Sequence, residues 1–306
     1  MNTAWIFPGQ GSQNVGMGKD LYQHTDIAKS YFEIANSIMG YDIKSIIFDG
    51  PKETLKLTQY TQPSIYIISV IIGKLLLEKG IRPNALAGHS LGEYSALTIG
   101  EVFDFETGLN LVKLRAENMA KAAKIKAGSM AAIVGLDENT VNDLCNNYSG
   151  EGIVVTANFN SPIQIVISGT PEAVKTVIEN AKINGARLAK MLNVSGAFHS
   201  PLMTPAREAL ALELNSIQIL DSIYPIFTNV DAKPNTIGKK IKDLLIAQLE
   251  KPVLWTQTIT EMSNQDIKSF LEIGPGKVLQ GLNKSINRSI PVSGIESIDQ
   301  LEKFNV

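Results

Sequence analysis

The pattern Gly-x-Ser-x-Gly at Gly88–Gly92 restricts the fold of this chain more than any other feature. The short apolar run 85–87 precedes it, and the helix-favouring segment 93–97 follows it. When a strand turns sharply into a helix, the glycines let the chain pass closely on both sides and the serine oxygen projects from the turn. The next N–H and the helix dipole can then stabilise an oxyanion. The pattern predicts that Ser90 is a nucleophile; the alternative is a tight turn in which Ser90 only caps the helix.

Short apolar runs lead into glycine-rich turns elsewhere in the chain as well. Residues 4–7 run into Pro8-Gly9-Gln10-Gly11, and residues 269–273 run into Gly274-Pro275-Gly276. A further apolar run lies at 223–227, and stretches of helical pattern separate these runs. Strands that alternate with helices indicate a parallel sheet. We therefore predict an α/β fold with an α/β-hydrolase-like large domain.

The order of elements changes between residues 126 and 194. Strands are expected at 129–135, 153–157, 164–168 and 187–194, with helices at 137–148 and after Pro171. This β-α-β-β-α-β order is that of the ferredoxin-like split unit. We predict a small ferredoxin-like domain at 126–194, inserted into a large domain that comprises 1–125 and 195–306. A chain of 306 residues is long enough for such a division.

Composition excludes several classes of function. A net charge of -2 gives no reason to expect nucleic-acid binding. Cys145 is the only cysteine, and the three histidines form no HExxH pattern, so neither a disulfide nor a metal site is expected. The first residues lack the basic segment of a signal peptide, and the apolar stretch 65–77 is too short to span a bilayer. We predict a cytoplasmic protein that is not bound to membranes, with 65–77 as a buried helix.

A serine nucleophile needs a base within hydrogen-bonding reach, and the chain offers three candidates. His24 lies in a polar early helix, and the side chain of His89 should point away from the adjacent serine. His199, directly after the small domain, is therefore favoured as the base, although a lone histidine is often structural. The loop at Gly9-Gln10-Gly11 lacks the residues of a Walker or dinucleotide motif. It can supply a second oxyanion N–H, and its alternative is an ordinary turn.

Six motifs in order resemble the malonyl-CoA:acyl carrier protein transacylase family over almost the whole chain. They are Phe7–Gln13, Thr61-Gln62-Pro63, Gly88–Tyr94, Arg115 with Met119 and Gly128–Ala132, Val194–Met203, and Glu272–Gly276. The resemblance implies that Ser90 is the nucleophile and His199 its base. It also assigns the third position of the relay to the backbone carbonyl of Gln248, so that replacing this side chain by alanine should preserve most of the turnover. The oxyanion donors would be the backbone N–H groups of Gln10 and Leu91.

The same resemblance implies a set of substrate-binding residues. Arg115 would hold the malonyl carboxylate as a bidentate fork, whereas from its helix alone it would be a surface ion-pair residue. Gln62, Asn160 and Phe198 would lie near the substrate, and a Phe before the histidine is typical of family members that use malonyl groups. One departure is Ile163, which stands where the family usually has glycine. If the turn required a positive φ there, Ile163 would be strained.

The expected reaction is a ping-pong transfer of a malonyl group from malonyl-CoA to the phosphopantetheine thiol of acyl carrier protein. The resemblance implies no cofactor, an acidic carrier protein that docks transiently, and a monomeric enzyme. One alternative is a free-standing acyltransferase that loads the carrier domains of a polyketide synthase. A second is a thioesterase or esterase, against which stand Arg115 and the lack of an acid-loop carboxylate. A third is an inactive docking module, against which stand Ser90 and His199.

Overall fold

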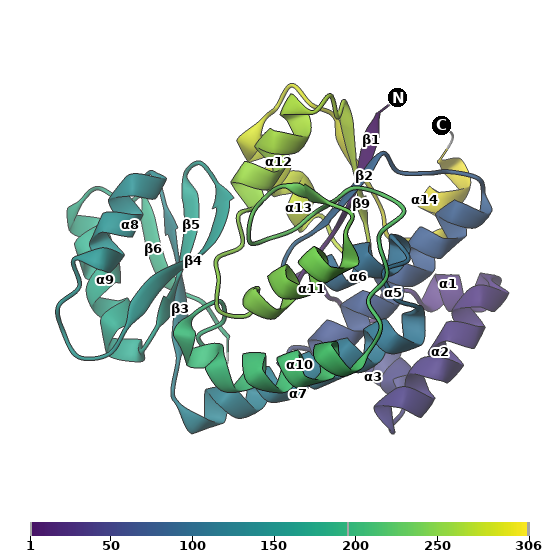
Figure 1. Ribbon diagram of the computed structural model, residues 1–306, viewed down its shortest axis with the longest axis horizontal. Helices are drawn as coiled ribbons and strands as arrows, with labels where there is room; N and C mark the ends of the chain where they lie inside the picture. Colours follow the sequence, from purple (N-terminus) through teal and green to yellow (C-terminus); the bar gives the residue numbers. More distant parts are fainter. Residues whose placement is uncertain (1, 195, 305–306) are drawn as a thin grey trace.

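The computed structural model describes residues 2–194 and 196–304, and these form two separate sheets (Figure 1). The larger sheet has six strands in the order β10-β9-β1-β2-β7-β8. Its strands are β1 Thr3–Phe7, β2 Ala85–Gly88, β7 Ile226–Phe227, β8 Pro234–Asn235, β9 Ser269–Ile273 and β10 Val292–Ile295. All neighbouring pairs are parallel except β7 and β8, which are antiparallel. A mixed α/β fold with a mainly parallel sheet, as predicted, is confirmed.

The smaller sheet is antiparallel, with the order β4-β5-β3-β6. Its elements are β3 Ser129–Val134, α8 Glu138–Asn146, β4 Val154–Ser161, β5 Gln164–Gly169, α9 Pro171–Ile183 and β6 Leu188–Met191. The two helices pack on this sheet around a hydrophobic core of their own, at the left of Figure 1. That core includes Val141 and Cys145 of α8 and Val174 and Val177 of α9. The sheet therefore has its own apolar support.

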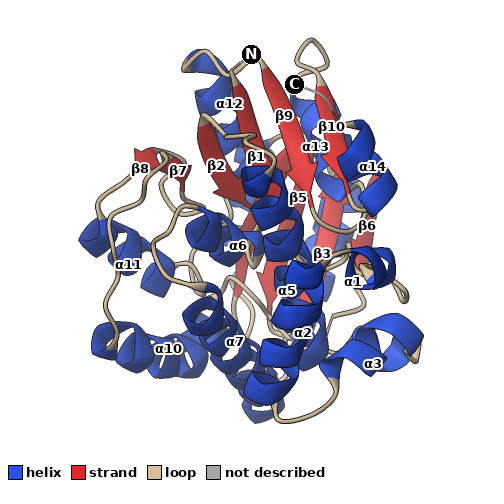
Figure 2. Ribbon diagram, turned by 90° about the vertical axis from the view of Figure 1, so that its right-hand side faces the viewer, coloured by secondary structure: helices blue, strands red, loops and turns tan. Residues whose placement is uncertain are grey.

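Helices cover both faces of the larger sheet (Figure 2). They are α1 Lys19–His24, α2 Asp26–Met39, α3 Ile43–Asp49, α4 Lys52–Leu55, α5 Thr58–Glu78, α6 Gly92–Ile99, α7 Phe105–Ile125, a 3-10 turn Pro201–Met203, α10 Thr204–Ser216, α11 Gly238–Ala247, α12 Trp255–Asn264, α13 Val278–Ile286 and α14 Ile298–Lys303. Alternate residues of β1 point to opposite sides. Trp5 and Phe7 enter the core that includes α5, α6 and α7, whereas Ala4 and Ile6 enter the core with α12 and α13. The segments that follow β1 and β2 line a cavity together with residues of the smaller sheet.

Helix α5 is the one helix in the described part of the chain that is long and apolar enough to cross a membrane. However, 83% of its most apolar window is buried inside the protein. Every residue from Thr61 to Gly73 is buried, and a run of this length covers all sides of the helix. A helix that is apolar all round and enclosed by other elements is a core helix. The interpretation of 65–77 as a buried helix is therefore confirmed.

One strand predicted from the sequence is shorter than expected, and the condition under which Ile163 would be strained is not met. The strand expected at 223–227 is formed only at Ile226–Phe227, because Pro225 lacks an N–H and Ile223 is exposed. Ile163 is not strained, since it is absent from the described non-glycine residues with positive φ. It lies in a two-residue turn between β4 and β5, and its carbonyl accepts a hydrogen bond from Gly135. A register shift in β4 near Ser161 accompanies this turn.

Candidate active site

Ser90 lies in a sharp turn between β2 and α6. Its φ is 51°, a left-handed conformation that costs a non-glycine residue roughly 1–2 kcal/mol. The flanking glycines are required by close contacts. A Cβ on Gly88 would lie 1.9 Å from the carbonyl carbon of Gly92, and one on Gly92 would lie 2.0 Å from the carbonyl oxygen of Phe7. The pattern that first indicated a nucleophile therefore has a steric basis.

The imidazole of His199 lies directly against the serine. Its Nε2 is 2.8 Å from Ser90 Oγ, and its Nδ1 is 2.8 Å from the carbonyl oxygen of Gln248 and 3.1 Å from that of Lys251. Both carbonyls can only accept, so Nδ1 carries the hydrogen and Nε2 is free to accept from the serine hydroxyl. No carboxylate in residues 2–194 and 196–304 is hydrogen-bonded to this ring. Ser195, part of the motif around His199, lies outside the described residues.

Burial determines the protonation state of His199. The ring is 4% exposed. Burial lowers the pKa of His199 to about 3, and the nearby Arg115 guanidinium lowers it further in the same direction. Because the charged form is disfavoured, the imidazole is neutral at physiological pH. It is therefore in the form that can accept the proton of Ser90.

Arg115 reaches the same serine from α7. Its guanidinium donates to Gln62 Oε1 at 2.6 Å, to Ser90 Oγ at 3.0 Å and to Gln248 Oε1 at 3.0 Å. The residue is 1% exposed, so the surface ion pair suggested by its helix alone is excluded. Its hydrogen-bond acceptors are all uncharged, and burial lowers the pKa of Arg115. A buried cation with neutral partners is suited to receive a carboxylate.

The side chain of Gln248 has a structural role that sequence reasoning missed. Its Nε2 donates to the carbonyl oxygen of Ser90 and to Glu93 Oε2, both at 2.9 Å, while its Oε1 accepts from Arg115. Glu93 is fully buried, and burial raises the pKa of its carboxyl to about 7. Gln248 therefore connects the nucleophile, the arginine and a buried acid. These side-chain contacts are additional to the main-chain role that the resemblance implies for Gln248.

We accordingly expect Gln248→Ala to raise the KM for malonyl-CoA, the substrate that the resemblance implies, by about tenfold, because buried polar partners are left unsatisfied. The backbone carbonyl that accepts from His199 remains in this variant, so kcat should change less than KM. Steady-state kinetics against malonyl-CoA measure both constants. Gln265→Ala, at an exposed position after α12, serves as the control with unchanged kinetics. Wild-type values of both constants in Gln248→Ala would show that the main chain alone matters.

The remaining sequence-predicted residues line one cavity with Ser90. This cavity of about 170 Å³ is lined by Gln10, Gln62, Leu91, Arg115, Asn160, Phe198 and His199, among others. No hydrogen bond from the backbone N–H of Gln10 or Leu91 is found within the described part of the chain, so both can serve an incoming oxygen. The loop carrying Gln10 is close to the turn that carries Ser90, since a Cβ on Gly9 would lie 2.5 Å from the carbonyl oxygen of His89.

The smaller sheet supplies one wall of this cavity. Met130, Asn158, Asn160 and Val166 come from β3, β4 and β5. Asn160 Oδ1 is 2.8 Å from His89 Nε2, so the ring of His89 is engaged there and not with Ser90. No cluster of three or more His, Cys, Asp or Glu residues suited to a metal ion occurs in the described ranges.

Nearly the whole chain matches one family model and curated relatives that share one name. The chain matches the family model of the acyl transferase domain over residues 4–303. It is 43% identical over 305 residues to the malonyl CoA-acyl carrier protein transacylase of Synechocystis, covering 100% of this chain and 99% of that protein. Its identity to the Bacillus subtilis protein of the same name is 41% over 300 residues, covering 98% and 95%.

Solved structures are equally similar. An acyl carrier protein S-malonyltransferase from Vibrio cholerae superposes with a TM-score of 0.95 at 40% identity, covering 99% of both chains. A malonyl-transacylase solved in complex with its type II polyketide acyl-carrier protein gives a TM-score of 0.95 at 39% identity, covering 99% of this chain and 98% of that one.

Proposed function

Because the chain belongs to the acyl transferase family, as a malonyl-CoA:acyl carrier protein transacylase of fatty acid synthesis, we propose that Ser90 carries the malonyl group between the two substrates. The hydrogen bond between Ser90 Oγ and His199 Nε2 is the observation that supports this most directly. A neutral imidazole that accepts the hydroxyl proton makes the serine oxygen nucleophilic.

In the first half-reaction, Ser90 Oγ attacks the thioester carbonyl of malonyl-CoA while its proton moves to His199 Nε2. The carbonyls of Gln248 and Lys251 accept from Nδ1–H and stabilise the imidazolium that forms. The backbone N–H groups of Gln10 and Leu91 would donate to the oxyanion. When the tetrahedral intermediate collapses, the carbon–sulfur bond breaks and His199 returns the proton to the leaving thiolate.

The second half-reaction reverses these steps with a different thiol. The phosphopantetheine thiol of the carrier protein gives its proton to His199 and attacks the malonyl ester on Ser90. The serine oxygen then leaves and regains the proton. Arg115 would hold the malonyl carboxylate in both halves, with Gln62, Asn160 and Phe198 around the acyl chain. This assignment of roles is supported by the shared cavity of these residues.

The division into domains is also part of the proposal. We place a ferredoxin-like small domain at 126–194 and an α/β-hydrolase-like large domain at 1–125 and 195–306. The β-α-β-β-α-β order, the sheet order β4-β5-β3-β6 and the separate core support the first. We propose a monomer, as the family resemblance implies, because the proposed site is complete without a residue from a second copy. The free, buried Cys145 and the enclosed helix α5 are consistent with a cytoplasmic location.

Mass measurement of the acyl intermediate tests the proposed function. Incubation with malonyl-CoA should add one malonyl group to the peptide that contains Ser90, and carrier protein should remove it as malonyl-carrier product. Ser90→Ala should show no adduct, whereas Ser95→Ala, on the next turn of α6, should keep it. An adduct of wild-type size in Ser90→Ala would refute the assignment. Loss of the group to water at the same rate with and without carrier protein would instead indicate a thioesterase.

A further inference from the structure

Asn229 contacts the nucleophile turn on both sides of His89. Its Oδ1 accepts from the backbone N–H of Ser90 at 2.7 Å, and its Nδ2 donates to the carbonyl oxygen of Gly88 at 2.6 Å. The residue is 1% exposed. Its own N–H donates to Glu93 Oε2 at 3.1 Å, and its carbonyl accepts from the N–H of Leu254 at 3.0 Å. Every polar group of Asn229 therefore has a partner.

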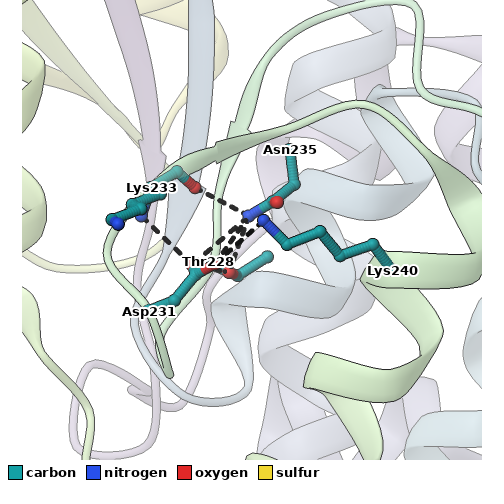
Figure 3. A network of polar contacts seen from close by, with 5 residues as sticks. All are labelled: Thr228, Asp231, Lys233, Asn235 and Lys240. Atoms are coloured by element: carbon teal, nitrogen blue, oxygen red, sulfur yellow. Dashed lines mark hydrogen bonds and ion pairs between the residues drawn. The ribbon is translucent and has the colours of Figure 1, made fainter.

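The turn that carries Asn229 is held by a second polar network (Figure 3). It joins β7 to β8, and its centre is the carboxylate of Asp231. The donors around this carboxylate are Thr228 Oγ1 at 2.6 Å, the N–H of Lys233 at 3.1 Å, Asn235 Nδ2 at 3.3 Å and Lys240 Nζ at 3.4 Å. These contacts fix the turn, so the amide of Asn229 is presented to Ser90 in one orientation.

We propose that Asn229 is a positioning residue for the nucleophile: its amide holds Ser90 in the left-handed conformation that directs Oγ to His199. The inference rests on the proposed role of Ser90. A serine with positive φ relaxes toward ordinary conformations unless its surroundings restrain it. One planar amide supplies both the acceptor that Ser90 N–H needs and the donor that the Gly88 carbonyl needs. The two contacts therefore connect Ser90, which has the positive φ, to Gly88 at the end of β2.

The variant Asn229→Asp tests the pair of contacts directly. An ionised carboxylate can still accept from Ser90, but its second oxygen then faces the carbonyl oxygen of Gly88 without a hydrogen. The protonated acid restores both contacts, because its O–H donates to Gly88. We expect the rate of malonyl-enzyme formation relative to wild type to fall by about 10- to 100-fold at pH 8 and to recover as the pH is lowered toward 5.

The titratable and charged groups around Asn229 are Glu93, which accepts from its N–H, Asp231 with Lys240 in the same turn, and His199 and Arg115, which bond to Ser90 Oγ. Burial raises the pKa of Glu93 to about 7, so this carboxyl titrates in the same pH range and would couple to the new one. Both rates are therefore also measured with Glu93→Gln, where their ratio at each pH isolates the new carboxyl. Single-turnover mass measurements at saturating malonyl-CoA supply the rates. The malonyl-CoA concentration for half-maximal rate should stay unchanged, because the amide does not line the cavity.

Asn283→Asp is the matched control for a buried carboxylate. Asn283 accepts from Trp255 Nε1 in α12 and does not touch the nucleophile turn. Its rate relative to wild type should be independent of pH. The proposal is overturned if the rate of Asn229→Asp relative to wild type does not change with pH. It is also overturned if the relative rate of Asn283→Asp recovers equally at low pH. If wild type forms no malonyl-enzyme, the proposed function itself fails.

A second variant decides the question if Asn229→Asp does not fold. Thr228→Val keeps the size of the side chain and removes the contact to Asp231, which loosens the turn without touching Ser90. We expect malonyl-enzyme formation to slow by about 3- to 10-fold, with an unchanged half-saturating concentration. An unchanged rate in Thr228→Val, with folding confirmed by its thermal midpoint, overturns the proposal.

Discussion

Replacement of His199 by alanine should slow malonyl transfer by about 10²- to 10⁴-fold at neutral pH, the range typical of losing a general base. His199 Nε2 is the acceptor within hydrogen-bonding reach of the Ser90 hydroxyl, and no second imidazole takes its place because His89 is bonded to Asn160. The loss should fall on kcat and on kcat/KM alike, since the ring acts on the reacting proton and not on the malonyl carboxylate. Transfer measured with purified carrier protein at fixed pH gives both constants.

The pH profile of the wild-type enzyme checks the same assignment. Burial lowers the pKa of His199 to about 3, so the base is neutral above that pH and is lost only as the pH falls through it. The acid limb of kcat/KM should therefore lie far below 6.5, the ordinary value for histidine. His24→Ala, which alters an exposed histidine, should leave rate and profile unchanged. Near wild-type activity in His199→Ala would exclude this histidine as the base. Because burial raises the pKa of Glu93 to about 7, an acid limb near 6.5 would exclude a buried imidazole only if it persisted in Glu93→Gln.

The nucleophile turn could be predicted from sequence because its causes are local. Glycine is required at 88 and 92 because a Cβ there would lie 1.9 Å and 2.0 Å from backbone atoms. The apolar strand and the helix flank these two glycines directly. The same is true of the smaller sheet, whose strands and helices follow one another within 126–194. Patterns of short range carry this information, since neighbouring residues determine the turn and the alternation of elements.

Asn229 could not be predicted in this way. It lies 139 residues from Ser90 in the chain, and nothing in its neighbourhood distinguishes it from an ordinary turn asparagine. The burial of Arg115 could not be predicted either, because Lys113 and Glu117 beside it in α7 are typical of a surface helix. The packing of distant elements against α7, α5 and α6 among them, removes Arg115 from water. Residues whose role depends on contacts between distant elements need the structure or a family resemblance.

Replacement of Arg115 by alanine should reduce malonyl transfer by roughly 30- to several-thousand-fold. Removing one partner of a buried, hydrogen-bonded charge pair costs on the order of 2–5 kcal/mol, and about 1.4 kcal/mol corresponds to tenfold. In the free enzyme the guanidinium donates to Gln62, Ser90 and Gln248, all uncharged acceptors. A malonyl carboxylate would supply the missing negative charge through two parallel bonds. Arg115→Lys keeps the charge but not the fork, so its loss should be intermediate.

Acetyl-CoA separates a specificity role of Arg115 from a structural one. An acetyl group has no carboxylate, so in wild type it leaves the buried guanidinium without a directly bonded anion and should be a poor substrate. Arg115→Ala removes that unpaired cation, and acetyl transfer should be held or increased while malonyl transfer falls. The ratio of kcat/KM for the two thioesters is the measurement, because a change in active protein cancels from it. Equal proportional loss with both thioesters would mean that Arg115 acts through its contacts to Gln62, Ser90 and Gln248 and not through the malonyl carboxylate, and that malonyl selection arises elsewhere in the cavity.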